Sequence, residues 1–273
     1  MKTSREFCSG IKVYRFQPCR NDDGTLRGDK ISPESLWFST PKKLNDPMDI
    51  DHPLDDLMRG DDGESLVLRE MAKVMYAPDQ NMYPHKLIND DLRERIQHWA
   101  SHGGHSLDIC YEFRERLLQL GVACFTPGWN NPPMWAHYAE DWMGFAIEYC
   151  IHQMDMACAP DNNGLLQFWV NYCSRIGQTS LAELLFSPNE AVSRILSAKT
   201  LPWSYEQEWR LIYLDSGDKA VKLPVGMQIT GIVLGSKSPR EQDQLFSDKC
   251  AKWGLPLRRV HVGLDRTLHL RDL

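Results

Sequence analysis

Short runs of β-branched, aromatic and aliphatic residues recur along the chain, and turn-forming residues such as glycine, proline and aspartate separate them. Such runs are typical of β-strands. One of them, at 206–214, also alternates, so that every second side chain shares a face. The pattern predicts strands at 11–16, 36–39, 122–126, 144–149, 170–173, 206–214, 229–235 and 259–262.

Three segments in the first half of the chain instead place apolar residues at the spacing of an amphipathic helix. Their apolar faces are most simply the faces that pack on a core. Gly121 follows the third segment, and we expect it to end that helix in the left-handed conformation that glycine tolerates. The predicted helices are 65–75, 90–99 and 107–120, then one or two turns at 134–138, and later helices at 189–199 and 239–253.

Helices that gather early and strands that recur throughout are typical of the α+β class. We therefore expect a mixed or antiparallel central sheet with an inserted helical region at about 65–120. No repeat, low-complexity segment or flexible linker divides the chain, so the prediction is a single domain over 1–273. Residues from about 216 to 273 form an extension without a recognisable motif.

Composition narrows the class of protein. The 273 residues are 42% hydrophobic and 25% charged, which excludes wholesale disorder, collagen and coiled coil. No run of about 18 apolar residues is present and the segment MKTSREFCSG is polar, so neither a spanning helix nor a secretory signal is expected. The net charge of −6 argues against general nucleic-acid binding. Eight cysteines without a CxxC pair predict reduced thiols in a cytoplasmic protein.

The densest cluster of polar and aromatic residues is 203–210, which reads WSYEQEWR. On a strand, Glu206, Glu208 and Arg210 share one face, with the two carboxylates about 7 Å apart. The opposite face, expected to be the core, carries Gln207, Trp209 and Leu211. One interpretation is a solvated face with a weak Glu208–Arg210 ion pair. The other is a cleft sheltered by the neighbouring aromatic residues, with Glu208 as its most important polar side chain.

Two carboxylates on one face of a strand have a specific chemical use. One can hold a ribose hydroxyl and stabilise the positive charge that develops as a glycosidic bond breaks. The second can orient or deprotonate an acceptor. Glu208 and Glu206 are the candidates for these two roles.

A second cluster holds Trp135, His137 and Tyr138. His137 can act as a base, a ligand or a hydrogen-bond donor to a diphosphate, and Tyr138 can stack on a flat ring. The alternative is a buried His–Tyr pair that holds a loop against the sheet. His102 and His105 have no carboxylate at ligand spacing, so no metal site is expected.

Two further positions lie near the ends of predicted strands. Ser39 and Asn45 would reach one end of the sheet, although the Asn45–Pro47 stretch is also an ordinary turn. Arg15 on the first strand can bind a diphosphate or ribose if it lies in a cleft, and is otherwise exposed. The chain has no GxSxG, GxGxxG or P-loop motif, which disfavours nucleophilic catalysis by a serine and nucleotide sites of the Rossmann and Walker types.

Taken in order, these clusters resemble a bacterial family known as domain of unknown function 2971. The resemblance covers about residues 11–215, and it implies a bacterial origin and a role as a toxin or in phage defence, without fixing an activity. It rests on the stretches at 13–16, 36–41, 44–47, 124–126, 134–138 with Gly144, and 203–210.

The chain also resembles the ADP-ribosyltransferase fold, which places a basic residue on an early strand, an aromatic or hydroxyl residue in the middle and a glutamate on a late strand. Arg15, then Ser39 or Tyr138, then Glu208 match that order. No Ser-Thr-Ser or His-Tyr-Glu sequence is present, so both middle residues stay candidates. This resemblance implies a split sheet, NAD as co-substrate, and a dinucleotide site formed by Arg15, Ser39, Asn45, Trp135, His137, Tyr138, Tyr205 and Arg210.

Three functions follow as hypotheses. In an ADP-ribosyltransferase, Glu208 would stabilise the ribosyl cation, Glu206 would orient a macromolecular acceptor that the sequence does not name, and Arg15 and His137 would hold NAD. A non-catalytic module would instead recognise a nucleotide, dinucleotide or peptide. A glycosidic or phosphodiester hydrolase would use Asp46, His137 and Glu208.

Overall fold

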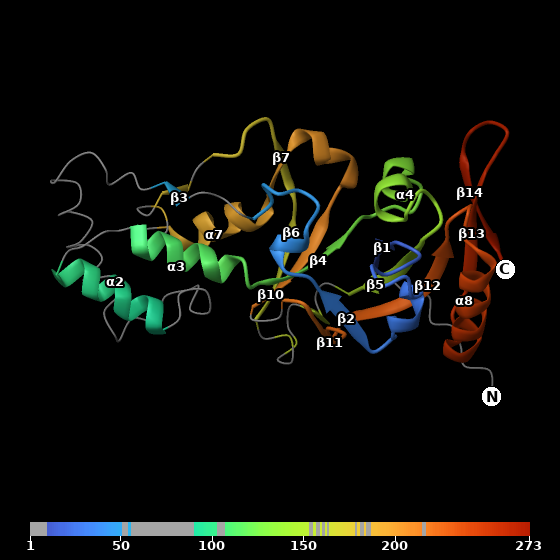
Figure 1. Cartoon of the computed structure of the whole chain (residues 1–273), viewed down its shortest axis with the longest axis horizontal. Helices are drawn as coiled ribbons and strands as arrows, with labels where there is room; N and C mark the ends of the chain where they lie inside the picture. The colour runs from blue at the N-terminus through green and yellow to red at the C-terminus, as the bar shows by residue number, and fades with distance from the viewer. Residues whose placement is uncertain are drawn as a thin grey trace.

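The computed structural model describes residues 10–50, 54–55, 90–102, 107–152, 155–156, 159, 162, 164–177, 179–180, 183, 187–214 and 217–273. The helix expected at 65–75 and His105 lie outside these residues. Figure 1 shows an elongated molecule with helices at one end and the C-terminal hairpin at the other.

The larger sheet has five strands in the order β1-β5-β12-β13-β14. Its neighbours pair antiparallel except β12 and β13, which are parallel, so the sheet is mixed. The strands are β1 (Ile11–Gln17), β5 (Phe145–Ile151), β12 (Met227–Leu234), β13 (Leu257–Val262) and β14 (Leu268–Asp272).

A second, antiparallel sheet has the order β4-β10-β6, with β4 at Gly121–Phe125, β10 at Trp209–Tyr213 and β6 at Leu165–Trp169. The remaining strands form pairs: β2 (Ser35–Phe38) with β11 (Lys219–Lys222), β7 (Asn171–Cys173) with β9 (Ala198–Thr200), and β3 (Leu54–Asp55) with β8 (Thr179–Ser180). The predicted α+β class with a mixed or antiparallel sheet is confirmed.

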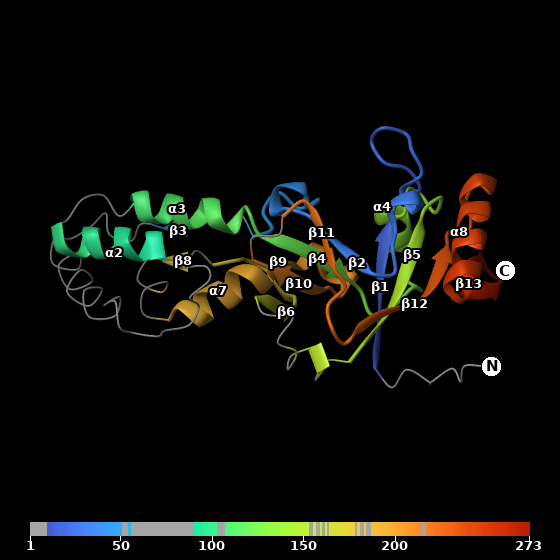
Figure 2. The same ribbon diagram turned by 90° about the horizontal axis from the view of Figure 1, so that it is seen from below.

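The helices cover the two ends of this arrangement. The turned view shows α2, α3 and α7 together at one end and α8 beside β13 at the other (Figure 2). Their bounds are α2 Asp90–His102, α3 Leu107–Leu117, α4 Pro132–Tyr138, α7 Pro188–Ser197 and α8 Arg240–Trp253, and 3₁₀ turns occur at 27–30, 41–43 and 201–206.

The two sheets meet at β4. Tyr14 on β1 exchanges backbone hydrogen bonds of 2.7 and 2.9 Å with Thr126, which directly follows β4. Ser39, directly after β2, exchanges bonds of 3.0 and 2.8 Å with Val122 on β4. These two bridges bring the middle of β1 beside the end of β4 and the end of β2 beside the start of β4, and the candidate site forms between them.

Both faces of the smaller sheet are buried, which explains its nearly continuous apolar strands. Val122 and Ile212 pack with α2, α3 and α7 in one hydrophobic cluster. Ala123 and Leu211, which alternate with them, pack against the larger sheet and α8 in a second cluster. A third cluster surrounds Trp135 on α4.

The structure corrects several local predictions. The strand expected at 206–214 begins at Trp209, because 201–206 is a 3₁₀ turn and Gln207 is left-handed with φ 47°. Gly121 opens β4 in extended conformation rather than capping a helix. The helix expected at 189–199 ends at Ser197, so Lys199 lies on β9.

Strands β6, β11 and β14 were not predicted. The sequences of β11 and β14 alternate or are polar and do not stand out as apolar runs, whereas β6 reads LLQFW and was missed although four of its five residues are apolar. Cys150 is disulfide-bonded, contrary to the expectation of reduced thiols. Five other cysteines of the described residues are not in disulfides: Cys19, Cys110, Cys124, Cys173 and Cys250. Within the described residues, no helix combines the length and apolar character needed to cross a membrane.

The packing predicts a large cost for truncating the smaller sheet. Ile212→Ala should lower the free energy of unfolding by about 2–5 kcal/mol, because Ile212 is fully buried and the substitution leaves a cavity. Leu264→Ala, at a fully exposed leucine, should change it by less than about 0.5 kcal/mol. Urea denaturation of both variants measures the difference, and equal effects would contradict the placement of Ile212.

Candidate functional site

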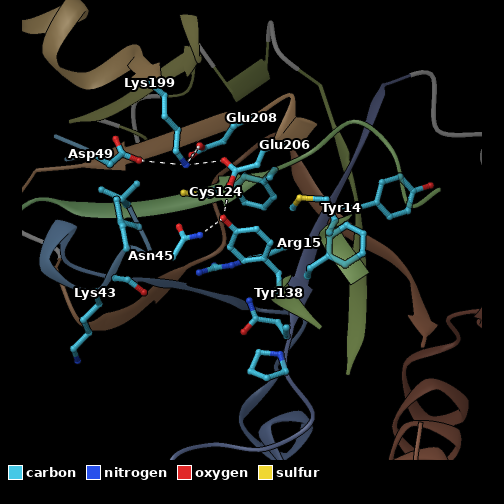
Figure 3. Close-up of a pocket in the computed structure, with 18 of the residues that line it drawn as sticks. Tyr14, Arg15, Lys43, Asn45, Asp49, Cys124, Tyr138, Lys199, Glu206 and Glu208 are labelled. Atoms are coloured by element: carbon cyan, nitrogen blue, oxygen red, sulfur yellow. Dashed lines mark hydrogen bonds and ion pairs between the residues drawn. The ribbon is translucent and has the colours of Figure 1, made fainter. Parts of the chain in front are cut away.

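A cavity of about 280 Å³ lies where β1, β4, α4 and the segment after β2 meet. We call it the carboxylate pocket. Figure 3 shows its acidic residues and Lys199 toward one end and Arg15 and Lys43 toward the other. The polar side chains that line it include Arg15, Ser39, Asn45, Asp49, Tyr138, Lys199, Glu206 and Glu208.

The wall behind this pocket is organised by Arg210, whose side chain is fully buried. Its Nε and Nη2 each donate to a Glu208 carboxylate oxygen at 2.9 Å. Its Nη1 and Nη2 donate to the two oxygens of Asp49, also at 2.9 Å. Nη1 further donates to the Leu196 carbonyl at 3.0 Å. One guanidinium therefore holds two carboxylates in bidentate geometry, the strongest form of such a pair.

Lys199 is the second buried cation of the wall. Its Nζ donates to Glu206 at 2.6 Å and to Glu208 at 3.3 Å, and it lies 3.6 Å from Asp49. It also lies 4.9 Å from the centre of the Trp203 ring. Burial acts to lower the pKa of Lys199, but the three carboxylates raise it above its ordinary value, so the amine is charged.

Three carboxylates and two cations leave this buried network with a net charge of −1. Burial acts to raise the pKa of Glu208, but the charges of Arg210 and Lys199 hold it at about 2. Burial raises the pKa of Glu206, and Lys199 only partly opposes this. The pKa values of Glu206 and Glu208, which are two residues apart in the sequence, are therefore shifted in opposite directions, as in catalytic acid–base pairs.

Glu206 also ends a short hydrogen-bonded chain in the pocket. The Tyr138 hydroxyl donates to Glu206 Oε1, and the Asn45 amide donates to that same hydroxyl (Figure 3). Burial and the adjacent Glu206 charge raise the pKa of Tyr138, so the phenol keeps its proton. The chain therefore fixes the orientation of the Glu206 carboxylate in the pocket.

Local backbone geometry brings the two glutamates together. The 3₁₀ turn at 201–206 and left-handed Gln207 replace the expected strand, and the Glu208 amide donates to the Tyr172 hydroxyl at 2.8 Å. On the other side, Asp46 accepts the Met48 amide at 3.0 Å, as in an Asx turn.

Arg15 lies on β1 at the other end of the pocket. Its Nη1 donates to the Trp37 carbonyl at 2.5 Å, and its guanidinium lies 6.0 Å from the Phe125 ring centre. Burial lowers the pKa of Arg15. No carboxylate of the described part of the chain forms an ion pair with it. This arginine is therefore a cation without a compensating charge.

The structure brings most of the predicted residues together, but not all. Arg15, Ser39, Asn45, Tyr138, Glu206 and Glu208 line the pocket, while Arg210 stands behind its wall. Trp135 is fully buried and donates from Nε1 to the Trp129 carbonyl at 2.6 Å. His137 contacts the Tyr205 hydroxyl at 2.9 Å, outside the pocket lining.

The solvated interpretation of the Glu208 face is wrong, because Glu206 and Glu208 are each 3% exposed. Sequence reasoning also missed Asp49, Lys199 and Cys124, which line the same pocket. One detectable feature of Lys199 was that a cation occupies the last position of the helix predicted at 189–199, directly after apolar residues. Burial raises the pKa of Cys124, and Glu208 adds to this, so the thiol is protonated.

Among the described residues, no group of three His, Cys, Asp or Glu side chains could hold a metal ion.

Comparison with known families bears on one side of this pocket. Residues 134–211 match the family described as "Protein of unknown function (DUF2971)". The resemblance to DUF2971 is thus confirmed. The DUF2971 match contains Tyr138, Lys199, Glu206, Glu208 and Arg210, so the buried network lies within it except for Asp49. Comparisons with curated proteins and with solved structures gave no match.

The network predicts that Arg210 is essential to the fold. Arg210→Met should lower the free energy of unfolding at pH 7 by about 3–5 kcal/mol, because it leaves Glu208 and Asp49 buried with Lys199 alone. Arg95→Met removes an exposed pair with Asp91 and should cost less than about 1 kcal/mol. Chemical denaturation compares them, and similar costs would contradict the role of Arg210.

The low pKa of Glu208 predicts a pH dependence of stability. Its pKa falls from 4.5 to about 2 on folding, so the ionised group stabilises the protein fully above pH 4.5. This stabilisation should be lost as the pH falls toward 2. Glu208→Gln should therefore flatten the loss of stability across that window, whereas exposed Glu94→Gln should not. Denaturation curves at several pH values test this, and parallel curves for wild type and Glu208→Gln would refute it.

Proposed function

We propose that the protein cleaves the bond between nicotinamide and ribose in NAD and transfers ADP-ribose to an acceptor. The observation that carries the proposal is the excess negative charge of the buried network, which faces a small pocket through Glu206 and Glu208. A fixed negative charge in a site of low dielectric stabilises positive charge that develops in a transition state. Glycosidic cleavage develops such a charge on the ribose.

Glu208 suits the stabilising role. Its carboxylate stays ionised at any physiological pH, and Arg210 fixes its orientation through two hydrogen bonds. As the bond breaks, nicotinamide leaves with the bonding electron pair and becomes neutral. The positive charge then resides on the ribose, beside the carboxylates.

Glu206 suits acid–base chemistry on the acceptor. Burial raises its pKa above the ordinary value of a glutamate, which makes the carboxylate a stronger base. In the transfer step an acceptor hydroxyl or amine forms a bond to the ribose carbon and gives its proton to Glu206. Tyr138 donates to this carboxylate and Asn45 donates to Tyr138, so the two residues hold the base in position.

Arg15, Ser39 and Asn45 complete the proposed dinucleotide site. The guanidinium of Arg15 is partly buried and forms no ion pair within the described residues. It would bind a phosphate, because a charge removed from water is stable only when it is compensated. His137, expected to share this task, instead contacts Tyr205 and supports the wall. Together with the DUF2971 match, the proposal keeps a bacterial toxin or phage-defence role in the cytoplasm as its biological setting.

A non-catalytic nucleotide-binding module is the second candidate. The observation that favours it is that both carboxylate oxygens of Glu208 already accept hydrogen bonds from Arg210. Such a carboxylate can be purely structural. The hydrolase hypothesis has less support, because Asp46 and His137 do not line the pocket.

Incubation with NAD labelled in the nicotinamide ring distinguishes these candidates. We expect release of nicotinamide by the wild type, and a loss of about 10²–10⁴-fold in Glu206→Gln, the usual contribution of a general base. Glu94→Gln, at an exposed position on α2, should keep full activity. Binding of NAD without release of nicotinamide, by both wild type and Glu206→Gln, would favour the binding module instead.

A further inference from the structure

A second cavity of about 740 Å³ adjoins the carboxylate pocket. The two cavities share Arg15, Gln17, Arg27, Ser39 and Lys43 in their linings, so they form one continuous recess. We call the second cavity the basic trough. Four cations and two carboxylates line it: Arg15, Arg27, Lys30, Lys43, Asp22 and Asp23.

The net charge of the side chains that line the basic trough has the opposite sign to the net charge of the whole chain. Four cations and two carboxylates give a local charge of +2, whereas the whole chain carries −6. Lys43 forms an ion pair with Asp218 at 3.1 Å, so its charge is compensated. The cations of the trough that could bind an anion are therefore Arg15, Arg27 and Lys30. Asp23 is engaged with Thr25, whose hydroxyl donates to it at 2.5 Å.

Arg15 and Arg27 stand out because both are partly buried cations and neither forms an ion pair with a described residue. Burial lowers the pKa of each. The charge of Arg27 lowers the pKa of Arg15 further, whereas the charge of Asp22 partly opposes the shift at Arg27. Within the described residues neither forms an ion pair, and Arg27 Nε donates only to the neutral Gln17 side chain at 2.6 Å. Two adjacent cations held in this way cost stability unless an anion joins them.

An exposed tryptophan lies next to these arginines. Trp37 on β2 lines the trough and is 44% exposed, which is unusual for a large apolar ring. The hydrogen bond from Arg15 to the Trp37 carbonyl fixes the guanidinium next to this residue. Exposed tryptophan rings beside cations are a common surface for stacking a nucleobase whose phosphate binds the cation.

We propose that the basic trough binds a nucleoside diphosphate moiety, with its phosphates on Arg15 and Arg27 and its base against Trp37. Asp22, which is exposed at the rim, would accept a hydrogen bond from a ribose hydroxyl. The inference deepens the proposed function and rests on it for the complete ligand, because the same moiety is one half of NAD. The trough itself takes the diphosphate moiety whether or not the protein cleaves NAD.

Calorimetric titration of the full chain with ADP tests the trough without turnover. ADP should bind, while adenosine and pyrophosphate, which each lack one half of the contacts, should bind at least about 10-fold more weakly. A 5′-phosphorylated oligonucleotide distinguishes the other source of the same chemistry. If the oligonucleotide binds more tightly than ADP, the ligand is a nucleic-acid end and the assignment to a free nucleotide is overturned.

Two substitutions locate the binding. Arg27→Gln should weaken ADP about 10-fold or more through loss of a charge-assisted hydrogen bond, and Trp37→Ala about 5–100-fold through loss of stacking. The matched controls are Arg271→Gln, on the exposed strand β14, and Trp169→Ala, at a tryptophan that is 49% exposed on β6. Both controls should bind ADP like the wild type.

The outcomes separate this inference from the proposed function. ADP binding that depends on Arg27 and Trp37, without release of nicotinamide from NAD, keeps the trough and removes the transferase. Release of nicotinamide with ADP affinity and the KM for NAD unchanged in both variants removes the trough and keeps the transferase. Absence of ADP binding at millimolar concentration also overturns the trough, and circular dichroism of each variant shows whether its fold is intact.

Discussion

A single buried guanidinium constrains the centre of this molecule. Arg210 is fully buried on a strand whose neighbours are apolar, and an isolated charge there would be prohibitively unstable. Its compensation comes from Glu208, two residues earlier, and from Asp49, 161 residues away. The segment after β2 must therefore reach β10, and the end of α7 must supply the Leu196 carbonyl. The carboxylate pocket is lined by the groups that satisfy this one charge.

Lys199 makes the network asymmetric. Arg210 binds both oxygens of Glu208, so this carboxylate is ionised and immobile, whereas Glu206 shares one lysine and one tyrosine hydroxyl. The difference depends on left-handed Gln207, because that residue turns the chain between the two glutamates. On an ordinary strand both carboxylates would face the same surroundings. The irregular backbone thus gives two chemically equivalent side chains different acidities, at a cost that the surrounding ion pairs offset.

Periodicity was sufficient to predict the strands that are short and apolar, such as β4 and β5, because burial on both faces leaves little else in their sequence. Periodicity placed Glu206 on a strand, which is wrong, since a 3₁₀ turn and a strand can carry the same alternation of Glu and Gln. Glu206, Glu208 and Tyr138 were nonetheless recognised as pocket residues from their clustering. Asp49 and Lys199 could not be, because their importance arises from pairing with a distant arginine. Local pattern carries no information about which distant charge compensates a buried one.

The recess as a whole is electrically polarised, and this polarity decides how a ligand can lie in it. One end carries the excess negative charge of the carboxylate network, and the other carries Arg15 and Arg27, which form no ion pair with any residue that the structure describes. Hydrogen bonds to the Trp37 carbonyl and to Gln17 hold these cations in place, so they do not fold over to neutralise the carboxylates. Under the proposed function, the cationic nicotinamide ring of NAD belongs at the acidic end and the diphosphate at the basic end. The reverse orientation would place like charges together at both ends, so electrostatics alone selects the reactive one.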